Sequence, residues 1–181
     1  ARCNAFGIKY LSKNIDFDYL ILMDGDGEDR PEELKSLVNK ALKEPNKSVV
    51  AKRIKRSEGL LFQMLYRFHK YLTLLTTVKL INFGNYSCLT KPDIKKLSNK
   101  GSLWSSYSGT FKKNIENYNE VNSVRGMRYF GPSQMSLFRL IIHSFSIIAV
   151  FKYRVFVLSL IFLTLLYCLG LLIKFNFFFF Q

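Results

Sequence analysis

The most constraining feature of the sequence is an uncharged apolar run near its end. Val155–Ile173 holds nineteen residues without Asp, Glu, Lys or Arg. At about 1.5 Å rise per residue, a helix of that length spans roughly 28 Å, which is the thickness of the hydrocarbon core of a bilayer. All its faces are apolar, which favours a transmembrane helix over a buried core helix. We therefore expect a transmembrane helix over residues 155–174, followed by an aromatic tail, or the start of a further span, over residues 175–181.

Basic residues dominate the chain and lie mostly before this run. There are 27 Lys and Arg against 13 Asp and Glu, which gives a formal net charge of +14. The positive-inside rule places the region before Lys152 on the cytoplasmic side of the membrane. A charge of this sign favours anionic partners such as nucleic acid, phosphorylated metabolites or an anionic membrane face.

A second helix is expected immediately before the span, over residues 133–154. Ser136, Arg139, His143 and Ser146 follow one another at intervals of three, four and three residues, so they form one polar stripe on a helix. Apolar residues occupy the other side. This pattern favours an amphipathic helix lying in the membrane interface. An ordinary amphipathic helix packed on the preceding domain is the alternative.

The first part of the chain predicts an α/β domain. Asp18–Met23 is a short apolar run typical of a strand buried on both faces. Pro31 marks the start of a helix, with Asp29 as its expected cap, and apolar residues then recur at helical spacing. Ser48–Ala51 reads as the next strand. A strand, a helix and a strand in this order imply a parallel βαβ unit, with Glu58–Leu80 as a later helical segment.

Carboxylates are concentrated where the first of these strands ends. Asp24, Asp26 and Glu28 alternate with glycines, which allow the backbone to bend so that the acids can face one cation. Mg²⁺ and Mn²⁺ favour such oxygen ligands together with substrate phosphates. Because ligands bind at the carboxyl ends of strands in such sheets, Arg53 or Arg56 is expected to neutralise the remaining phosphate charge.

The acids at residues 24–28 are also open to other interpretations. An EF-hand calcium loop fails at Asp29, where glycine is needed, and at Lys35, where the bidentate Glu should stand. The interpretation of these acids as a solvated acidic turn that caps a helix remains an alternative. A non-enzymatic anchor that binds lipid or nucleic acid through charge alone is disfavoured, because acids repel phosphate unless a metal intervenes. We therefore expect no nucleic-acid partner.

Three blocks of the sequence together resemble one family. They are "MDGDGEDRPEEL" (Met23–Leu34), "FGNYSCLTKPDIKKL" (Phe83–Leu97) and "RGMRYFGPSQMSLFRLIIHSFSIIAVF" (Arg125–Phe151). In this order they resemble membrane-associated family 2 glycosyltransferases of the dolichol- and polyprenyl-phosphate type. The resemblance implies a partial GT-A domain, with a mostly parallel Rossmann-like sheet, over residues 1–132. The family's upstream strand has no counterpart here, so we expect an N-terminally truncated fragment; an inactive fragment of the enzyme is an alternative to an active one.

The resemblance also implies roles for individual residues. The metal ligands would be Asp24, Asp26 and Glu28, with Mg²⁺ or Mn²⁺ as the cofactor; the catalytic residues would be Asp24, Asp26 and Arg128; the substrate-binding residues would be Arg53, Asn85, Tyr86, Arg125 and Arg128. Three positions depart from the family pattern. Gln134 stands where a basic residue is expected, Pro132 is unusual in its turn, and Ser102 replaces an expected Glu.

The implied reaction moves a sugar from a nucleotide-diphosphate donor to a lipid-phosphate acceptor, with inversion at the anomeric carbon. A lipid phosphate is already ionised and needs no general base. The sequence suits this, because the only acids between Ile94 and Pro132 are Glu116 and Glu120. A hydroxyl acceptor would require a positioned carboxylate or His.

Overall fold

The computed structural model describes residues 2–55, 64, 67, 71, 73, 74, 81–131 and 136–179. Within these ranges, residues 55, 137 and 176–179 are described by their backbone alone. The expected helical segment Glu58–Leu80 therefore lies almost wholly outside the described residues. The same holds for Arg56, Pro132 and Gln134.

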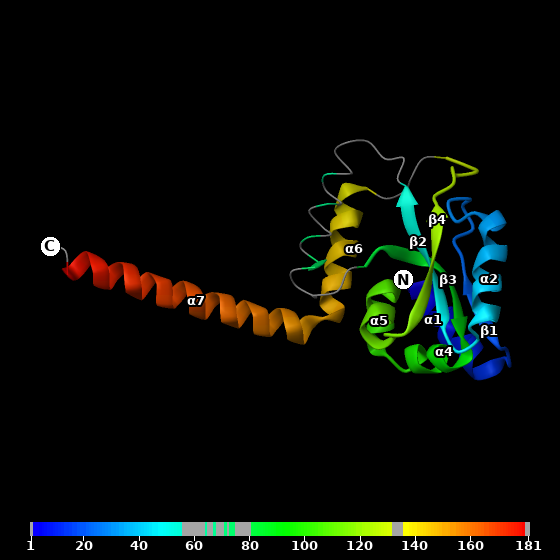
Figure 1. Ribbon diagram of the computed structural model, residues 1–181, viewed down its shortest axis with the longest axis horizontal. Coiled ribbons are helices and arrows are strands. Elements are labelled where there is room, and N and C mark those ends of the chain that lie inside the picture. Colours follow the sequence, from blue (N-terminus) through cyan, green and yellow to red (C-terminus); the bar gives the residue numbers. More distant parts are fainter. Residues whose placement is uncertain are drawn as a thin grey trace.

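The described residues contain four strands in one mixed sheet (Figure 1). The strands are β1 (Tyr19–Leu22), β2 (Ser48–Lys55), β3 (Phe83–Thr90) and β4 (Tyr118–Val124), and their order in the sheet is β1-β3-β2-β4. β3 pairs antiparallel with β1 and β2, whereas β2 and β4 pair in parallel. Three strands therefore run in one direction and β3 runs against them. The expected α/β class is confirmed.

Helices cover both faces of this sheet. The helices in the described residues are α1 (Arg2–Asn14), α2 (Leu34–Lys43), α4 (Lys91–Ser98), α5 (Tyr107–Asn114), α6 (Leu137–Val150) and α7 (Lys152–Phe179), with short 3-10 turns at η1 (Pro31–Glu33) and η2 (Gly101–Trp104). The first four of these helices pack on the sheet. α2 packs on one face through Leu37 and Ala41, against Val49, Ala51 and Cys88. The other face is covered by α1, α4 and α5, whose apolar residues form a larger core (Figure 1).

The expected βαβ unit is present, with one difference in its sheet. β1 and β2 run in the same direction and α2 connects them, but β3 lies between them. β1 is consequently an edge strand, and Ile21 on it is 36% exposed. The expectation of a strand buried on both faces is wrong for β1. It fits β2 better, where Val49, Val50 and Ala51 are all buried in the middle of the sheet.

The last two helices leave the sheet in succession. α6 packs on α5 through Ile147 and Val150, which are buried, and Lys113 Nζ donates to the carbonyl oxygen of Val150 at 2.7 Å. Its other side exposes Phe138 and Phe145. The C-terminal end of the helix thus packs on the domain, and the placement of its exposed apolar side chains in a membrane interface stays a prediction.

α7 extends away from the domain (Figure 1). By length and composition, its segment Lys152–Phe175 is the one helix in the described part of the chain that is able to cross a membrane; its mean hydropathy is 2.7 and none of it is buried. The helix begins three residues before the expected start at residue 155, because Lys152 and Arg154 continue the helix although they are charged.

Candidate active site

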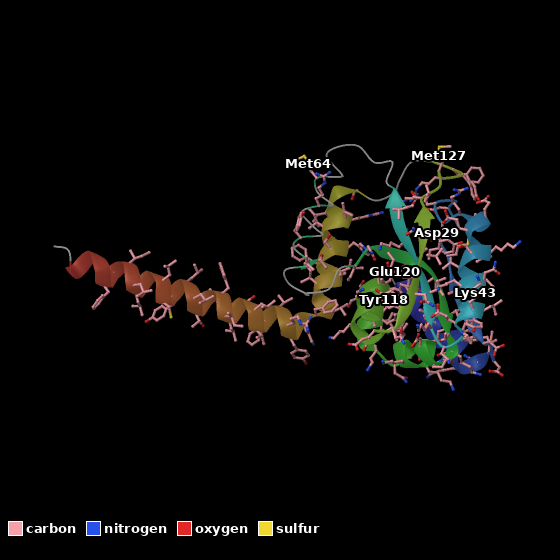
Figure 2. All side chains as sticks on the ribbon, in the orientation of Figure 1. Asp29, Lys43, Met64, Tyr118, Glu120 and Met127 are labelled. Carbon is pink, nitrogen blue, oxygen red and sulfur yellow. The ribbon has the colours of Figure 1, made fainter. Side chains whose placement is uncertain are left out.

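One end of the sheet gathers the segments that the sequence singles out. β1, β2 and β4 end there and the antiparallel β3 begins there. We call this end the rim, formed by residues 24–30 after β1, Arg53 on β2, residues 84–86 on β3 and residues 125–129 after β4. Figure 2 labels Asp29 and Met127 toward this end, whereas Tyr118 and Glu120 lie farther down the sheet.

Asp29 is the buried residue of the acidic turn, by which we mean residues 24–29, and its side chain holds the turn in place. Its residue is only 3% exposed, and its Oδ2 accepts from the backbone N–H of Asp24 at 3.0 Å. Its Oδ1 lies 3.5 Å from Nη2 of Arg53. Burial raises the pKa of Asp29, although the N–H of Asp24 and the charge of Arg53 act in the opposite direction. The expectation that Asp29 caps the helix is wrong, since Arg30 holds that position without a side-chain cap bond.

Asn85 and Tyr86 are neighbours on β3, but their side chains make contacts in different places. Asn85 Nδ2 donates to Oδ1 of Asp24 at 3.1 Å, so it orients the carboxylate that the sequence assigned to a metal. Tyr86 is 1% exposed in the core beneath α2, and its hydroxyl donates to the carbonyl oxygen of Arg30 at 2.9 Å. Burial raises the pKa of Tyr86 to about 12. The expected substrate contact of Tyr86 therefore needs correction, because its side chain supports the turn and has almost no accessible surface.

Glu28 pairs with two arginines from the segment that follows β4. Its Oε2 pairs with Nη2 of Arg125, and its Oε1 accepts from Nε of Arg128 at 2.8 Å. Arg128 Nη2 also lies 3.0 Å from Oδ2 of Asp26. Partial burial raises the pKa of Glu28, but the hydrogen bonds from the two arginines outweigh it and leave this pKa below its ordinary value. The bond to Glu28 raises the pKa of Arg128.

The expected metal site fits these residues in part. Asp24 and Asp26 carry the oxygen donors that Mg²⁺ and Mn²⁺ prefer. Both oxygens of Glu28 already accept from guanidinium groups, so the expectation of three carboxylates near one point is not met. Among the residues that the structure describes, no group of three His, Cys, Asp or Glu side chains is arranged to hold a metal ion. Asp26 is itself engaged, since its Oδ1 accepts from the N–H of Glu28 at 3.0 Å and its Oδ2 lies 3.0 Å from Nη2 of Arg128, so a cation held by Asp24 and Asp26 would share Asp26 with these groups.

The formal charges at the rim cancel. Four carboxylates, from Asp24, Asp26, Glu28 and Asp29, are balanced by four guanidinium groups, from Arg30, Arg53, Arg125 and Arg128. Carboxylates placed among the arginines lower the attraction of the rim for an anionic ligand, and a bound divalent cation would restore a positive sum.

The structure brings most of the residues singled out from the sequence to the rim and adds contacts that the sequence does not predict. From the sequence, Asp29 is expected as a cap and Glu28 as a metal ligand, and neither is paired with an arginine. The close approach of Gly126 to Gly27 was also missed, although the glycine between Arg125 and Met127 was a signal for it. Ser102, where the family pattern has Glu, accepts from the hydroxyl of Thr110 at 3.0 Å.

Comparison with known proteins identifies the family. No curated protein and no solved structure matches the chain. A family model, described as glycosyl transferase family 2, matches residues 6–129. The match covers more than half of the 181 residues and contains every rim residue named above. The chain belongs to glycosyl transferase family 2.

Proposed function

We propose that this protein transfers a sugar from a nucleotide-diphosphate donor to a polyprenyl-phosphate-type lipid at the membrane surface, with inversion at the anomeric carbon. Family membership supports glycosyl transfer from a nucleotide sugar. The observation that carries the finer proposal is the rim itself, where a pair of aspartates and three arginines meet at one end of the sheet.

The donor half of the proposal follows from the chemistry of these groups. Asp24 and Asp26 would hold Mg²⁺ or Mn²⁺, and the metal, when bound, supplies positive charge to the diphosphate leaving group. Asn85 orients the carboxylate of Asp24, and Asp29 fixes its backbone. Arg53 enters from β2 and is 20% exposed, so its guanidinium reaches the same space while it neutralises the buried Asp29. Preorganised charges of this kind stabilise a developing negative charge without reorganisation.

The acceptor half is supported by the positions of the two acids between Ile94 and Pro132, because neither lies at the described rim. Glu120 pairs with Lys52 at 2.9 Å and lies farther down the sheet (Figure 2). Glu116 precedes β4, whose seven residues separate it from the rim by about 23 Å at 3.3 Å per residue. Neither is placed to activate a hydroxyl, whereas an ionised lipid phosphate needs no base. The apolar α7 and the exposed apolar side chains of α6 support a substrate that arrives in a membrane.

A non-enzymatic anion-binding anchor is the alternative class. Such a protein would present an uncompensated basic surface. In the described rim, all four arginines instead pair with carboxylates, which lowers the affinity of the rim for an anion in the absence of a metal. The acidic turn therefore favours the enzyme.

The test is transfer of label from a radioactive nucleotide sugar in membranes that contain the protein. We expect label in the organic extract, in a form that mild acid releases. Arg128→Ala should lower this labelling at least tenfold, and Arg2→Ala, at the far N-terminus, should leave it unchanged. Label found only in a water-soluble glycan or in protein would contradict the lipid acceptor. Absence of any transfer with all common donors would contradict the enzyme.

A further inference from the structure

Ion pairs and backbone hydrogen bonds join two loops that lie at opposite edges of the sheet. The acidic turn follows β1 at one edge, and the segment 125–129 follows β4 at the other. Glu28 makes the side-chain part of this connection, with one carboxylate oxygen on Arg125 and the other on Arg128. The connection therefore spans the ends of β3 and β2, where Asn85 and Arg53 lie.

The backbones of the two loops are joined as well. Gly126 N donates to the carbonyl oxygen of Glu28 at 2.9 Å, and Tyr129 N donates to that of Asp26 at 3.0 Å. A Cβ at Gly126 would lie 2.5 Å from the carbonyl oxygen of Gly27, and the ring of Tyr129 packs directly on Gly27. These contacts do not depend on ionisation, so they are a second, independent sign that the two loops are built to meet.

We propose that Glu28 is a positioning residue that holds Arg125 and Arg128 in place, and that it is not a metal ligand. Its side chain is 13% exposed and those of the arginines are 21% and 24% exposed, so the pairs are shielded enough to be ordered. Both carboxylate oxygens of Glu28 pair with guanidinium groups. Asp26 faces only one of these guanidinium groups, since its Oδ2 lies 3.0 Å from Nη2 of Arg128 and its Oδ1 accepts from the backbone N–H of Glu28 at 3.0 Å. A cation would therefore displace fewer ion pairs at Asp24 and Asp26 than at Glu28. The consequence for catalysis rests on the proposed function, in which these arginines face phosphate.

Limited trypsin digestion tests the connection without any substrate. Trypsin cleaves after arginine, and cleavage of a folded chain follows the population of the open form when reclosure is fast. In the full protein in detergent, without nucleotide or added metal, Glu28→Gln should raise cleavage after Arg125 and Arg128 about tenfold. Cleavage after Lys112, in α5, should not change, because it reports opening of the whole domain.

Glu32→Gln is the matched control, since Glu32 lies in the same segment but is 70% exposed and pairs only with Arg30 among the described residues. It should leave all three cleavages unchanged. Unchanged cleavage after Arg125 and Arg128 in Glu28→Gln would overturn the proposal. A rise that includes the site after Lys112 would also overturn it, because Glu28 would then support the whole fold and not these two arginines.

Mn²⁺ dependence separates a positioning residue from a ligand. In nucleotide-diphosphate binding measured by calorimetry, Asp26→Asn should raise the half-saturating Mn²⁺ concentration about tenfold, and Glu28→Gln should change it less than twofold. An equal rise in both variants would overturn the positioning role. In transfer assays, Glu28→Gln added to a variant that already carries Arg125→Ala and Arg128→Ala should lower kcat/KM no further, because both arginines that Glu28 positions are then absent. If the wild type binds no nucleotide, the proposed function fails and the tryptic comparison still decides the positioning role.

Discussion

Single glycines determine whether the two loops of the rim can meet. Gly27 has a φ of +89°, a region that side-chain-bearing residues rarely adopt, and the ring of Tyr129 covers it. Gly126 approaches the carbonyl oxygen of Gly27 so closely that no Cβ fits between them. Gly25, which the sequence also marked as a bend residue, has neither a positive φ nor a neighbour within 4 Å of an added Cβ. Of the two glycines of the acidic turn, the conformation therefore requires Gly27.

Gly126→Ala is expected to destabilise the domain, whereas Gly25→Ala is not. The new Cβ of Gly126→Ala would meet backbone, which cannot rotate away, so the loops must separate at a cost of about 1–3 kcal/mol in the free energy of unfolding. Chemical denaturation of the protein in detergent, followed by circular dichroism, measures this difference. Equal midpoints for the two variants would contradict the close approach.

Asp26 is the residue on which the proposed metal role depends most directly. We expect Asp26→Ala to abolish Mn²⁺-dependent binding of a nucleotide diphosphate, measured by calorimetry, with at least a hundredfold loss of affinity. The reason is that one of the two available carboxylates is removed from the cation. Asp18→Ala, an exposed acid just before β1, is the control and should bind as wild type. Equal binding by Asp26→Ala and wild type would exclude the metal role.

At the residue scale, the sequence predicts which side chains gather at the rim but not how their charges pair. Asp24, Asp26, Arg53, Asn85, Arg125 and Arg128 were each singled out from local spacing or from resemblance, and the structure brings them together at the rim. Which acid meets which arginine depends on the register between strands that are far apart in sequence. Local pattern carries no information on such pairing, so the two ion pairs of Glu28 cannot be predicted from the sequence.

At the scale of elements, α5 joins the sheet to the last two helices. Phe111 on α5 is fully buried and makes edge-to-face contacts with Phe83 on β3 and Tyr118 on β4, with ring centroids 5.4 and 5.2 Å apart. Its neighbours Gly109 and Lys113 contact Val150 of α6. The position of α6 relative to the rim is therefore set through the packing of Phe111.

Phe111→Ala is expected to lower the free energy of unfolding by about 3–5 kcal/mol, because it leaves a cavity where three aromatic rings meet. Phe6→Ala, on an exposed part of α1, removes the same side chain without a cavity and should cost less than about 1 kcal/mol. Both variants can be compared by denaturant unfolding in detergent. A similar loss in both would contradict the core assigned to α5.

The elements themselves were largely predictable, and their order in the sheet was not. Helical spacing of apolar residues indicated α2, and an apolar run indicated β1, because both signals are local. The insertion of β3 between β1 and β2 was missed, since it is a long-range antiparallel pairing. Its consequence was an error in burial: β1 is an edge strand, and Ile21 is partly exposed.

At the scale of the whole molecule, charge and apolarity are separated along the chain. Of the 27 Lys and Arg residues, only Lys174 follows residue 154, so 26 precede the apolar part of α7. All 13 acids also precede it. The apolar side chains of α7 from Phe156 to Phe175 lie on the surface of the protein as described, with no part of the domain against them. Such a surface is stable only in contact with another apolar phase.

The last prediction is the orientation of α7 in a membrane. The basic residues that flank its N-terminal end, Lys152 and Arg154, together with the basic domain before them, should remain on the cytoplasmic side, because translocating positive charge near a span is disfavoured. Protease added outside sealed cells should therefore leave residues 2–151 intact, and the same protease should degrade them once the membrane is permeabilised. A single-cysteine variant that keeps only Cys3, which is exposed on α1, gives an independent measurement with a membrane-impermeant maleimide. Labelling of Cys3 only after permeabilisation would agree with this orientation, and labelling in sealed cells would reverse it and place the nucleotide-sugar site on the other side of the membrane.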